Sequence, residues 1–252
     1  MGIPTASSTP SRAARAHSRI QTAANGSRPT RPPGRAVEPR LYIYVMSYDF
    51  GFAPNPFHGV CTLACCKPDI RRTARVSDWI VGVGGGKLKA TGRCIFAMQV
   101  TGAMTFDEYW NSDEFRVKRP KRNGSLVVRV GDNVYHTCSD TGRWLQEDCV
   151  HSQPGGTQDP ENTGHDTGTD RILISRNFIY FGDNAPRIPD DILASLPYKN
   201  GRAHRVYPQA SCARLLEWIQ RQAGGAFNRV LGDPYQLSSG HRYYSKSLNR
   251  MV

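Results

Sequence analysis

The chain has 252 residues, enough for one domain with a sizeable core, and its 33 Lys and Arg against 21 Asp and Glu give a net charge of +12. No apolar run approaches the roughly 18 residues that span a membrane. The composition therefore excludes a membrane-spanning class. It favours a polyanionic partner such as DNA or a nucleotide, although the same charge also suits solubility alone.

The seven cysteines are an odd number, and no hydrophobic signal-peptide core precedes them. The adjacent pair Cys65 and Cys66 also argues against a regular disulfide framework. We therefore expect reduced thiols in a cytoplasmic protein.

Residues 1–40 contain seven arginines against the single acidic residue Glu38, and they have almost no bulky apolar side chain. Such a segment cannot compensate for the entropy it would lose on ordering. We predict a disordered basic tail over residues 1–40 and a single domain over residues 41–252. A tail that adds non-specific affinity for nucleic acid and an inert tail are both compatible with this composition.

Short apolar segments separated by turn residues predict strands at 41–46, 79–83, 94–101, 126–130, 171–175 and 178–181. Helical spacing appears at 106–110, where Thr105 can serve as N-cap, and at 211–223. Residues 139–168 are rich in turn formers and predict no long regular element. The predicted fold class is α+β, mainly β, with a compact twisted sheet and a few flanking helices.

The segment 49–71, DFGFAPNPFHGVCTLACCKPDIR, is the most unusual part of the sequence. It connects two predicted strands, yet it carries phenylalanines and cysteines where a surface loop carries Ser, Asn and Asp. A long apolar connection that prolines restrict is usually a functional site or its wall. The alternative is a structural Ω-loop that closes the end of a barrel.

The cysteines of this segment have three interpretations. A catalytic nucleophile at Cys61, Cys65 or Cys66 needs a nearby base, for which His136, His151 and His165 are candidates. A metal site is disfavoured because no second ligand pair has suitable spacing, so we predict none. Buried, inert thiols are the third interpretation, and the sequence leaves it open beside the nucleophile.

The remaining ionisable candidates are carboxylates and a histidine. Asp49 follows the first predicted strand, where functional groups often collect, but it also suits a turn. His165 and Asp166 are adjacent, so the carboxylate can orient the imidazole as a general base or can stabilise a turn. The basic run at 115–123 is either an exposed loop or a phosphate-contacting one.

Several segments together resemble a known family. They are YVMSYDFGFAPNPFHGVCTLACCKPDIRRTA, SDWIVGVG, GDNVYH, HDTGTDRILISRNFIYFG and NAPRIP. Over about 41–232 this order resembles the second family of nucleotide-modification-associated domains of prokaryotes and phages. The family pattern has Gly-Asp where this chain has Ser77 and Asp78, a difference that touches turn geometry. The element order is also similar to small PUA- and EVE-like barrels, which makes such a barrel an alternative to the open sheet.

The resemblance implies a component of a DNA or nucleotide base modification system, acting on or recognising a modified base in DNA. Two alternatives are a reader of modified bases without catalysis and an enzyme that tailors free nucleotides. DNA or a nucleotide, and other proteins of such a system, are the implied partners, and the cofactor is left unknown. The catalytic candidates are Asp49, Cys61, Cys65, Cys66, His165 and Asp166, and the substrate-binding candidates are Phe52, Asn55, Phe57, Lys67, Arg71, Trp79 and His136.

Overall fold

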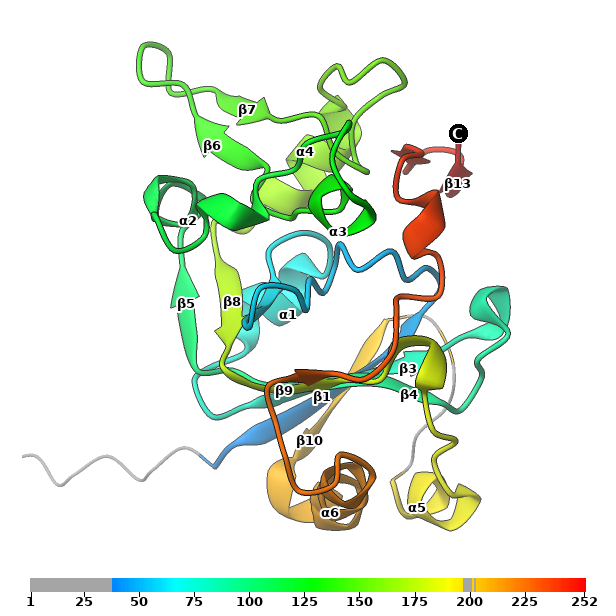
Figure 1. Cartoon of the computed structure of the whole chain (residues 1–252). Helices are drawn as coiled ribbons and strands as arrows, with labels where there is room; N and C mark the ends of the chain where they lie inside the picture. The colour runs from blue at the N-terminus through cyan, green and yellow to red at the C-terminus, as the bar shows by residue number, and fades with distance from the viewer. Residues whose placement is uncertain (1–37, 197–200, 202) are drawn as a thin grey trace, which may run out of the picture. The chain divides into compact units, whose positions relative to one another are not determined.

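The computed structural model describes residues 38–196, 201 and 203–252 (Figure 1). The predicted tail therefore lies outside the described residues except for its last three. The division into a tail and a single domain stays a prediction.

A six-stranded sheet in the order β10-β1-β3-β4-β9-β11 forms the base of the fold. Its strands are β1 (Arg40–Met46), β3 (Trp79–Gly84), β4 (Cys94–Gln99), β9 (Asn177–Tyr180), β10 (His204–Pro208) and β11 (Arg229–Val230). The pairs β1–β3 and β9–β11 are parallel and the other pairs are antiparallel. β1 and β3 are almost wholly buried, as their continuous apolar sequences predict for strands covered on both faces.

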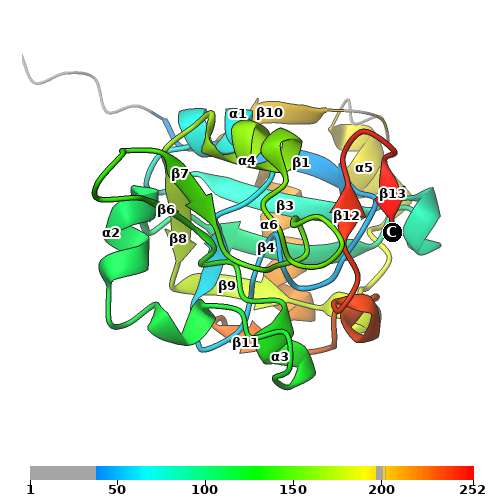
Figure 2. The same cartoon turned by 90° about the horizontal axis from the view of Figure 1, so that it is seen from above.

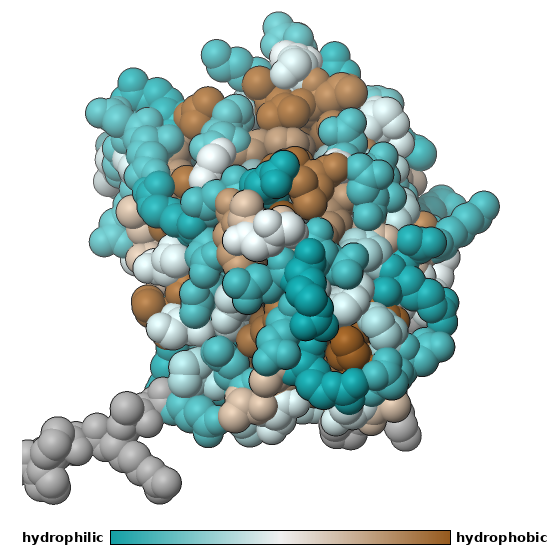
Figure 3. Space-filling model, turned by 60° about the horizontal axis from the view of Figure 1, so that its bottom comes forward, coloured by the Kyte–Doolittle hydropathy of each residue, from teal (hydrophilic) through white to brown (hydrophobic). Residues whose placement is uncertain are grey.

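Helices α5 (Asp190–Ser195) and α6 (Ala213–Gln222) cover one face of this sheet (Figure 1). The helix predicted at 211–223 is confirmed as α6. Leu215, Trp218 and Ile219 are buried at helical spacing and join the core of the sheet. The face shown in Figure 3 has apolar residues in separate patches among hydrophilic ones.

The opposite face carries a second layer. A three-stranded antiparallel sheet, β2 (Cys61–Leu63), β8 (Ile172–Ser175) and β5 (Gly102–Met104), stands beside α1 (Pro68–Thr73). Only short connections separate β4 from β5 and β8 from β9, so these two chain segments run from one sheet into the other. This continuity fixes the position of the second layer on the first.

Further elements complete the second layer: α2 (Phe106–Asn111), α3 (Leu126–Arg129), the hairpin β6 (Tyr135–Thr137) and β7 (Trp144–Gln146), and α4 (Pro160–Thr167). Near the C-terminus, β12 (Tyr244–Ser245) pairs with β13 (Arg250–Met251). Seen from above, α4 and both hairpins lie over the six-stranded sheet (Figure 2). Both hairpins contribute to a second apolar core that includes the segment following β1.

In the second layer, one predicted element is confirmed, one is wrong and one helix was missed. The helix at 106–110 is confirmed as α2, and its N-cap Thr105 forms a capping box with Glu108. The strand predicted at 126–130 is wrong, because LVVR forms the short helix α3, whose side chains are only partly buried. Within the turn-rich stretch, α4 was missed although Asp159 and Pro160 are typical of an N-cap and a first helical residue.

The predicted α+β class, with a twisted sheet and few flanking helices, is confirmed. Of the two predicted arrangements the described part of the chain adopts open sheets, and its strands form no closed barrel. None of the helices described is long and apolar enough to cross a membrane.

A buried polar network ties the loop after β1 to the second layer. Lys118 is fully buried, and its Nζ donates to the backbone and side-chain oxygens of Asn55 and to Thr62 Oγ1. Asp132 accepts from Thr62 Oγ1 at 2.6 Å and from the Tyr109 hydroxyl at 2.8 Å. Burial lowers the pKa of Lys118 and raises that of Asp132, while the attraction between the two charges opposes both shifts.

Removing one partner of such a buried pair leaves the other charge uncompensated. We expect Lys118→Met to lower the free energy of unfolding by about 3–5 kcal/mol, measured by urea denaturation. The matched control is Lys121→Met, at an exposed position, with an expected change within about 0.5 kcal/mol. Equal stability of the two variants would contradict the structural role of the network.

Candidate active site

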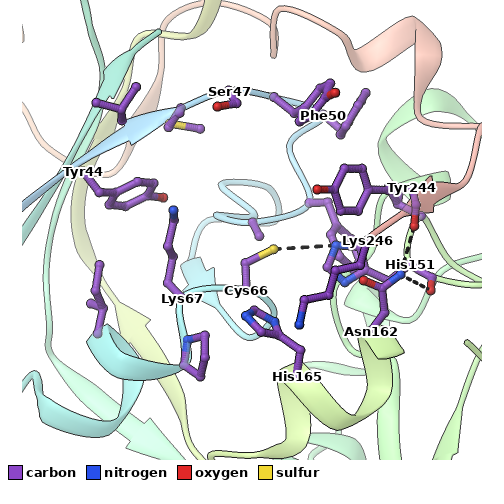
Figure 4. A pocket seen from close by; sticks show the side chains of 18 of the residues that line it. Tyr44, Ser47, Phe50, Cys66, Lys67, His151, Asn162, His165, Tyr244 and Lys246 are labelled. Atoms are coloured by element: carbon purple, nitrogen blue, oxygen red, sulfur yellow. Dashed lines mark hydrogen bonds between the residues drawn. The ribbon is translucent and has the colours of Figure 1, made fainter. Parts of the chain in front are cut away.

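The site is built on a strained turn between β2 and α1. Cys66 and Lys67 have φ values of 58° and 42°, in the left-handed region that residues with a side chain rarely adopt. Lys67 caps α1, and Pro68 occupies its first turn. Strain of this kind persists only where the surroundings enforce it, and it is concentrated at functional sites. The turn presents the Cys66 side chain at the base of a cavity (Figure 4).

Arg71 of α1 enforces the turn. Its side chain is fully buried, and its Nε donates to the Cys66 carbonyl at 2.8 Å. One terminal nitrogen donates to the carbonyls of Thr169 and Arg171, and the other donates to that of Asp166. A single guanidinium therefore joins the Cys66 turn to the end of α4 and the start of β8.

Cys66, His151 and Asp166 form a consecutive series of polar contacts. Cys66 Sγ lies 3.6 Å from His151 Nε2, and His151 Nδ1 lies 2.7 Å from Asp166 Oδ2. The three residues come from the β2–α1 turn, the β7–α4 loop and α4. A nucleophile, a base and a carboxylate that orients the base are the parts of a catalytic triad, with geometry suited to proton transfer.

Neighbouring groups hold the imidazole in place. The His151 ring packs edge-on against Phe52, with centroids 4.8 Å apart, and lies 5.9 Å from the Tyr244 ring. The Asn162 amide donates to the backbone carbonyls of His151 and Tyr244 at 3.0 and 2.9 Å. Packing and hydrogen bonds thus restrict both the ring and the loop that carries it.

The electrostatics favour an ionised pair. Burial alone would lower the pKa of His151, but the negative charges of Cys66 and Asp166 outweigh burial and raise it well above its ordinary 6.5. Burial would raise the pKa of Asp166, but His151, His165 and Arg71 together lower it. Asp166 is therefore ionised and His151 protonated at neutral pH, which places a positively charged imidazolium 3.6 Å from Cys66 Sγ.

The cavity above Cys66 has a volume of about 480 Å³, within the range of small-molecule sites. Its walls combine aromatic rings with groups that can carry positive charge. The rings are Tyr44, Tyr48, Phe50, Phe52 and Tyr244, and the polar groups include Lys67, His165, His204 and Lys246. Figure 4 shows Lys67 and Tyr44 on the side of Cys66 opposite to His151.

The same three residues come close enough to be considered as metal ligands. Their hydrogen bonds argue against it, because His151 Nδ1 is directed at Asp166 and only Nε2 remains. Asp166 is saturated: Oδ1 accepts from the Cys66 N–H and contacts His165 Nδ1, and Oδ2 contacts His151 Nδ1 and accepts from the Tyr135 hydroxyl. Cys66 and His151 then supply two ligands, fewer than the three or four protein ligands of zinc sites.

A family model described as nucleotide modification associated domain 2 matches residues 38–241. The chain belongs to this family. The resemblance seen in the sequence is confirmed, and a part in nucleotide modification follows from it. No curated protein and no solved structure matches the chain.

The nucleotide modification associated domain has a cavity that brings together several predicted site residues. Cys66, Lys67, Phe52 and His165 line it, and Asp166 lies directly behind His151. His165 Nδ1 is 3.1 Å from Asp166 Oδ1, so the two neighbours predicted as a base and its partner do interact. The imidazole that faces the sulfur, however, is that of His151.

The other catalytic candidates lie outside the cavity lining. Cys61 is buried in β2 and Cys65 is buried beside Asp132, and burial raises the pKa of both thiols, that of Cys61 to about 12. Asp49 is buried and accepts hydrogen bonds from the Tyr180 hydroxyl and the Tyr235 N–H. These contacts give the three residues structural partners.

The remaining substrate-binding candidates also contact protein groups. Asn55 donates to the Gly51 and Val130 carbonyls. The Arg71 guanidinium donates to the backbone carbonyls of Cys66, Asp166, Thr169 and Arg171. Trp79 packs on Phe227, Phe57 packs against the second core, and His136 stacks on Trp110 with centroids 4.1 Å apart. None of these five lines the cavity among the residues described.

The basic run at 115–123 is neither a simple exposed loop nor a free phosphate site. Lys118 is buried in the polar network, and Arg119 lies over the Trp110 ring at 3.6 Å. Arg122 donates to the carbonyls of Gly240 and His241. Three of its five basic side chains, those of Lys118, Arg119 and Arg122, therefore bind other groups of the same chain.

Sequence reasoning named His151 only as one possible base and missed Tyr44, Asn162, Tyr244 and Lys246. No local pattern marks His151, because 85 residues separate it from Cys66. The available signal was the Asp159-Pro160 start of α4, which places Asn162, His165 and Asp166 on one helix.

The contact between Cys66 and the His151 imidazole predicts a sulfur that reacts readily with electrophiles. An ordinary thiol is only about 1% ionised at pH 6.5, and iodoacetamide reacts with thiolates. We expect His151→Ala to slow the alkylation of Cys66 at pH 6.5 by about 10- to 100-fold, followed by intact-mass spectrometry. Cys138 is partly exposed and a hydrogen bond with Thr141 lowers its pKa, so both proteins should carry Cys138→Ser. Rates within twofold of each other would contradict the pairing.

Asp49 predicts a pH-dependent stability. Burial raises its pKa from 3.8 to about 6, despite the hydrogen bonds from Tyr180 and Tyr235. The folded state therefore binds more protons than the unfolded state between pH 4 and 6, so this group's contribution to stability falls as pH rises through that window. We expect the stability difference between wild type and Asp49→Asn to fall by about 3 kcal/mol from pH 4 to pH 7, measured by urea denaturation at each pH. A constant difference would show that the pKa of Asp49 is unshifted, and a rising difference would show that the fold lowers it; either result would contradict the prediction.

Proposed function

We propose that this chain is a cysteine-dependent enzyme of a nucleotide-modification system, which makes or breaks an acyl bond on a nucleotide substrate. The observation that carries the proposal is the contact series from Cys66 Sγ through His151 to Asp166 at the base of the cavity. Membership of the family indicates that the substrate is a nucleotide, and the arrangement of Cys66, His151 and Asp166 indicates acyl transfer as the reaction class.

In the first step the Cys66 thiolate attacks the carbonyl carbon of the substrate. The electron pair of the carbonyl moves to its oxygen, and then returns as the bond to the leaving amine or alcohol breaks. His151 gives its proton to that leaving group, and a thioester on Cys66 results.

In the second step water or an acceptor amine attacks the thioester. His151 takes the proton of the incoming group, and the Cys66 thiolate leaves. Asp166 stays ionised throughout and holds Nδ1 of the imidazole, so that Nε2 faces the sulfur. Hydrolysis removes an acyl group, and attack by an amine transfers it.

The cavity suits a nucleotide for two reasons. Its volume of about 480 Å³ accommodates one nucleotide, and its aromatic rings provide faces for stacking a base. The lining also includes Lys67 and Lys246, which favour an anionic ligand. A base in DNA reaches such a site only when it is unstacked and flipped out of the duplex, whereas a free nucleotide enters directly.

A second candidate function is a reader that binds a modified base without changing it. The aromatic wall favours this candidate as much as it favours the enzyme. The two differ in what they require: the reader needs the rings, and the enzyme needs the sulfur and the imidazole.

The deciding experiment incubates the protein with DNA and, separately, with a mixture of free nucleotides. The DNA should include both canonical DNA and hypermodified phage DNA. After digestion to nucleosides, mass spectrometry detects a changed base. We expect Cys66→Ser to reduce product by about 1000-fold or more while the binding of substrate is retained.

Matched variants separate the alternatives. Cys61→Ser changes a buried thiol outside the cavity and serves as the control for loss of a sulfur atom. Absence of product from every substrate, together with binding that Phe52→Ala weakens by about 1–3 kcal/mol, would establish the reader instead. Binding to DNA should also weaken steeply with salt, because phosphate neutralisation releases counterions.

A further inference from the structure

A thiolate that attacks a carbonyl needs donors for the negative charge that develops on the carbonyl oxygen. In many cysteine and serine enzymes the backbone N–H of the nucleophile is one of them. Here the Cys66 N–H donates to Asp166 Oδ1 at 2.8 Å, so it is already committed. Donors for the oxyanion must come from other groups in the cavity.

The Tyr44 hydroxyl is the first such group. Tyr44 lies near the end of β1 with a relative exposure of 2%, and its hydroxyl has no hydrogen-bond partner among the residues that the structure describes. Its ring is fixed by edge-on packing against Phe96. A buried hydroxyl without a partner costs free energy that a bound ligand can recover, so its presence in a cavity wall points to a ligand atom.

The Lys67 ammonium is the second group. Its Nζ lies 4.5 Å from the centroid of the Tyr44 ring, and it forms no hydrogen bond with the residues that the structure describes. The strained backbone at Lys67 places this side chain beside that of Cys66. A cation in this position can stabilise a negative oxygen close to the attacking sulfur.

The arrangement across the cavity is the one that acyl transfer requires. Figure 4 shows Tyr44 and Lys67 on one side of Cys66 and His151 on the other. A carbonyl group above the sulfur then has its oxygen toward Tyr44 and Lys67, and its leaving group toward the imidazolium. Burial, and after it the charge of Cys66, raises the pKa of Tyr44, so its hydroxyl keeps its proton. Burial lowers the pKa of Lys67, and the charge of Cys66 opposes that shift.

We propose that the Tyr44 hydroxyl and the Lys67 ammonium form the oxyanion site of this enzyme, an inference that rests on the proposed acyl-transfer function. Tyr44 donates a hydrogen bond to the substrate oxygen and keeps its proton. Lys67 contributes positive charge without transferring a proton. Both are therefore catalytic residues that act on the reacting group itself.

Two reagents separate this role from thiolate formation. Alkylation of Cys66 by iodoacetamide is a displacement at a saturated carbon, so no oxyanion develops. Acylation of Cys66 by p-nitrophenyl acetate passes through a tetrahedral oxyanion and releases p-nitrophenolate. The ratio of the acylation rate to the alkylation rate therefore reports on the oxyanion site and cancels changes in the thiolate.

We expect Tyr44→Phe to lower this ratio by about 100-fold, because one oxyanion donor is commonly worth 10²–10³ in rate. Lys67→Met should lower the ratio in the same direction and serves as the second variant if Tyr44→Phe fails to fold. The matched control is Tyr42→Phe on the same strand, whose hydroxyl contacts Thr73 outside the cavity and whose loss should leave the ratio unchanged.

The outcomes are distinct. A ratio within threefold of wild type for both cavity variants, in proteins with unchanged melting temperature, would overturn the oxyanion assignment while the acyl-transfer function stands. A wild-type protein that iodoacetamide alkylates at Cys66 but that the ester never acylates would overturn the acyl-transfer function, and the oxyanion assignment with it.

Discussion

The candidate site depends on one buried guanidinium. Arg71 is fully enclosed and donates to backbone carbonyls of the Cys66 turn, the end of α4 and the start of β8. The Cys66 turn and the connection from α4 to β8 lie 100 residues apart in the sequence, counted from Cys66 to Asp166. Without this shared donor their carbonyls would lose a hydrogen-bond partner, at a cost of about 1–3 kcal/mol for each carbonyl that is buried. The arginine therefore stabilises the fold and positions the nucleophile through the same set of hydrogen bonds. A lysine cannot replace it, since its point charge lacks the planar fork that reaches several acceptors at once.

Asp166 is the electrostatic counterpart of Arg71. Its two oxygens contact the Cys66 N–H, His165, His151 and Tyr135, so a single carboxylate orients both the nucleophile's backbone and the base. The commitment of the Cys66 N–H to this carboxylate explains why the oxyanion site must be sought on the opposite wall of the cavity. In the proposed mechanism, positioning of the nucleophile and stabilisation of the oxyanion thus fall to different groups.

The loop after β1 combines two kinds of buried polar group. Asp49, with the Lys118–Asp132 network, holds the loop against both cores, and the hydrogen bonds of these groups are directed at protein partners. Cys66 and Lys67 point into the cavity instead. The contrast explains why three cysteines within six positions have different surroundings: Cys61 and Cys65 are enclosed, and only Cys66 is partly accessible.

The sequence by itself determined the family, the α+β class, and helices such as α2 and α6, because these depend on local composition, capping and periodicity. Only the tertiary structure decided which cysteine faces the cavity and which histidine meets it. His151 lies 85 residues from Cys66, and Asp166 lies 100 residues from it. Contacts over such distances leave no trace in local spacing, since they arise from how β8, α4 and α1 pack around Arg71. LVVR forms the helix α3 against its apolar β-like pattern. Of the basic run 115–123, Lys118, Arg119 and Arg122 make contacts within the fold, whereas Arg116 and Lys121 are exposed.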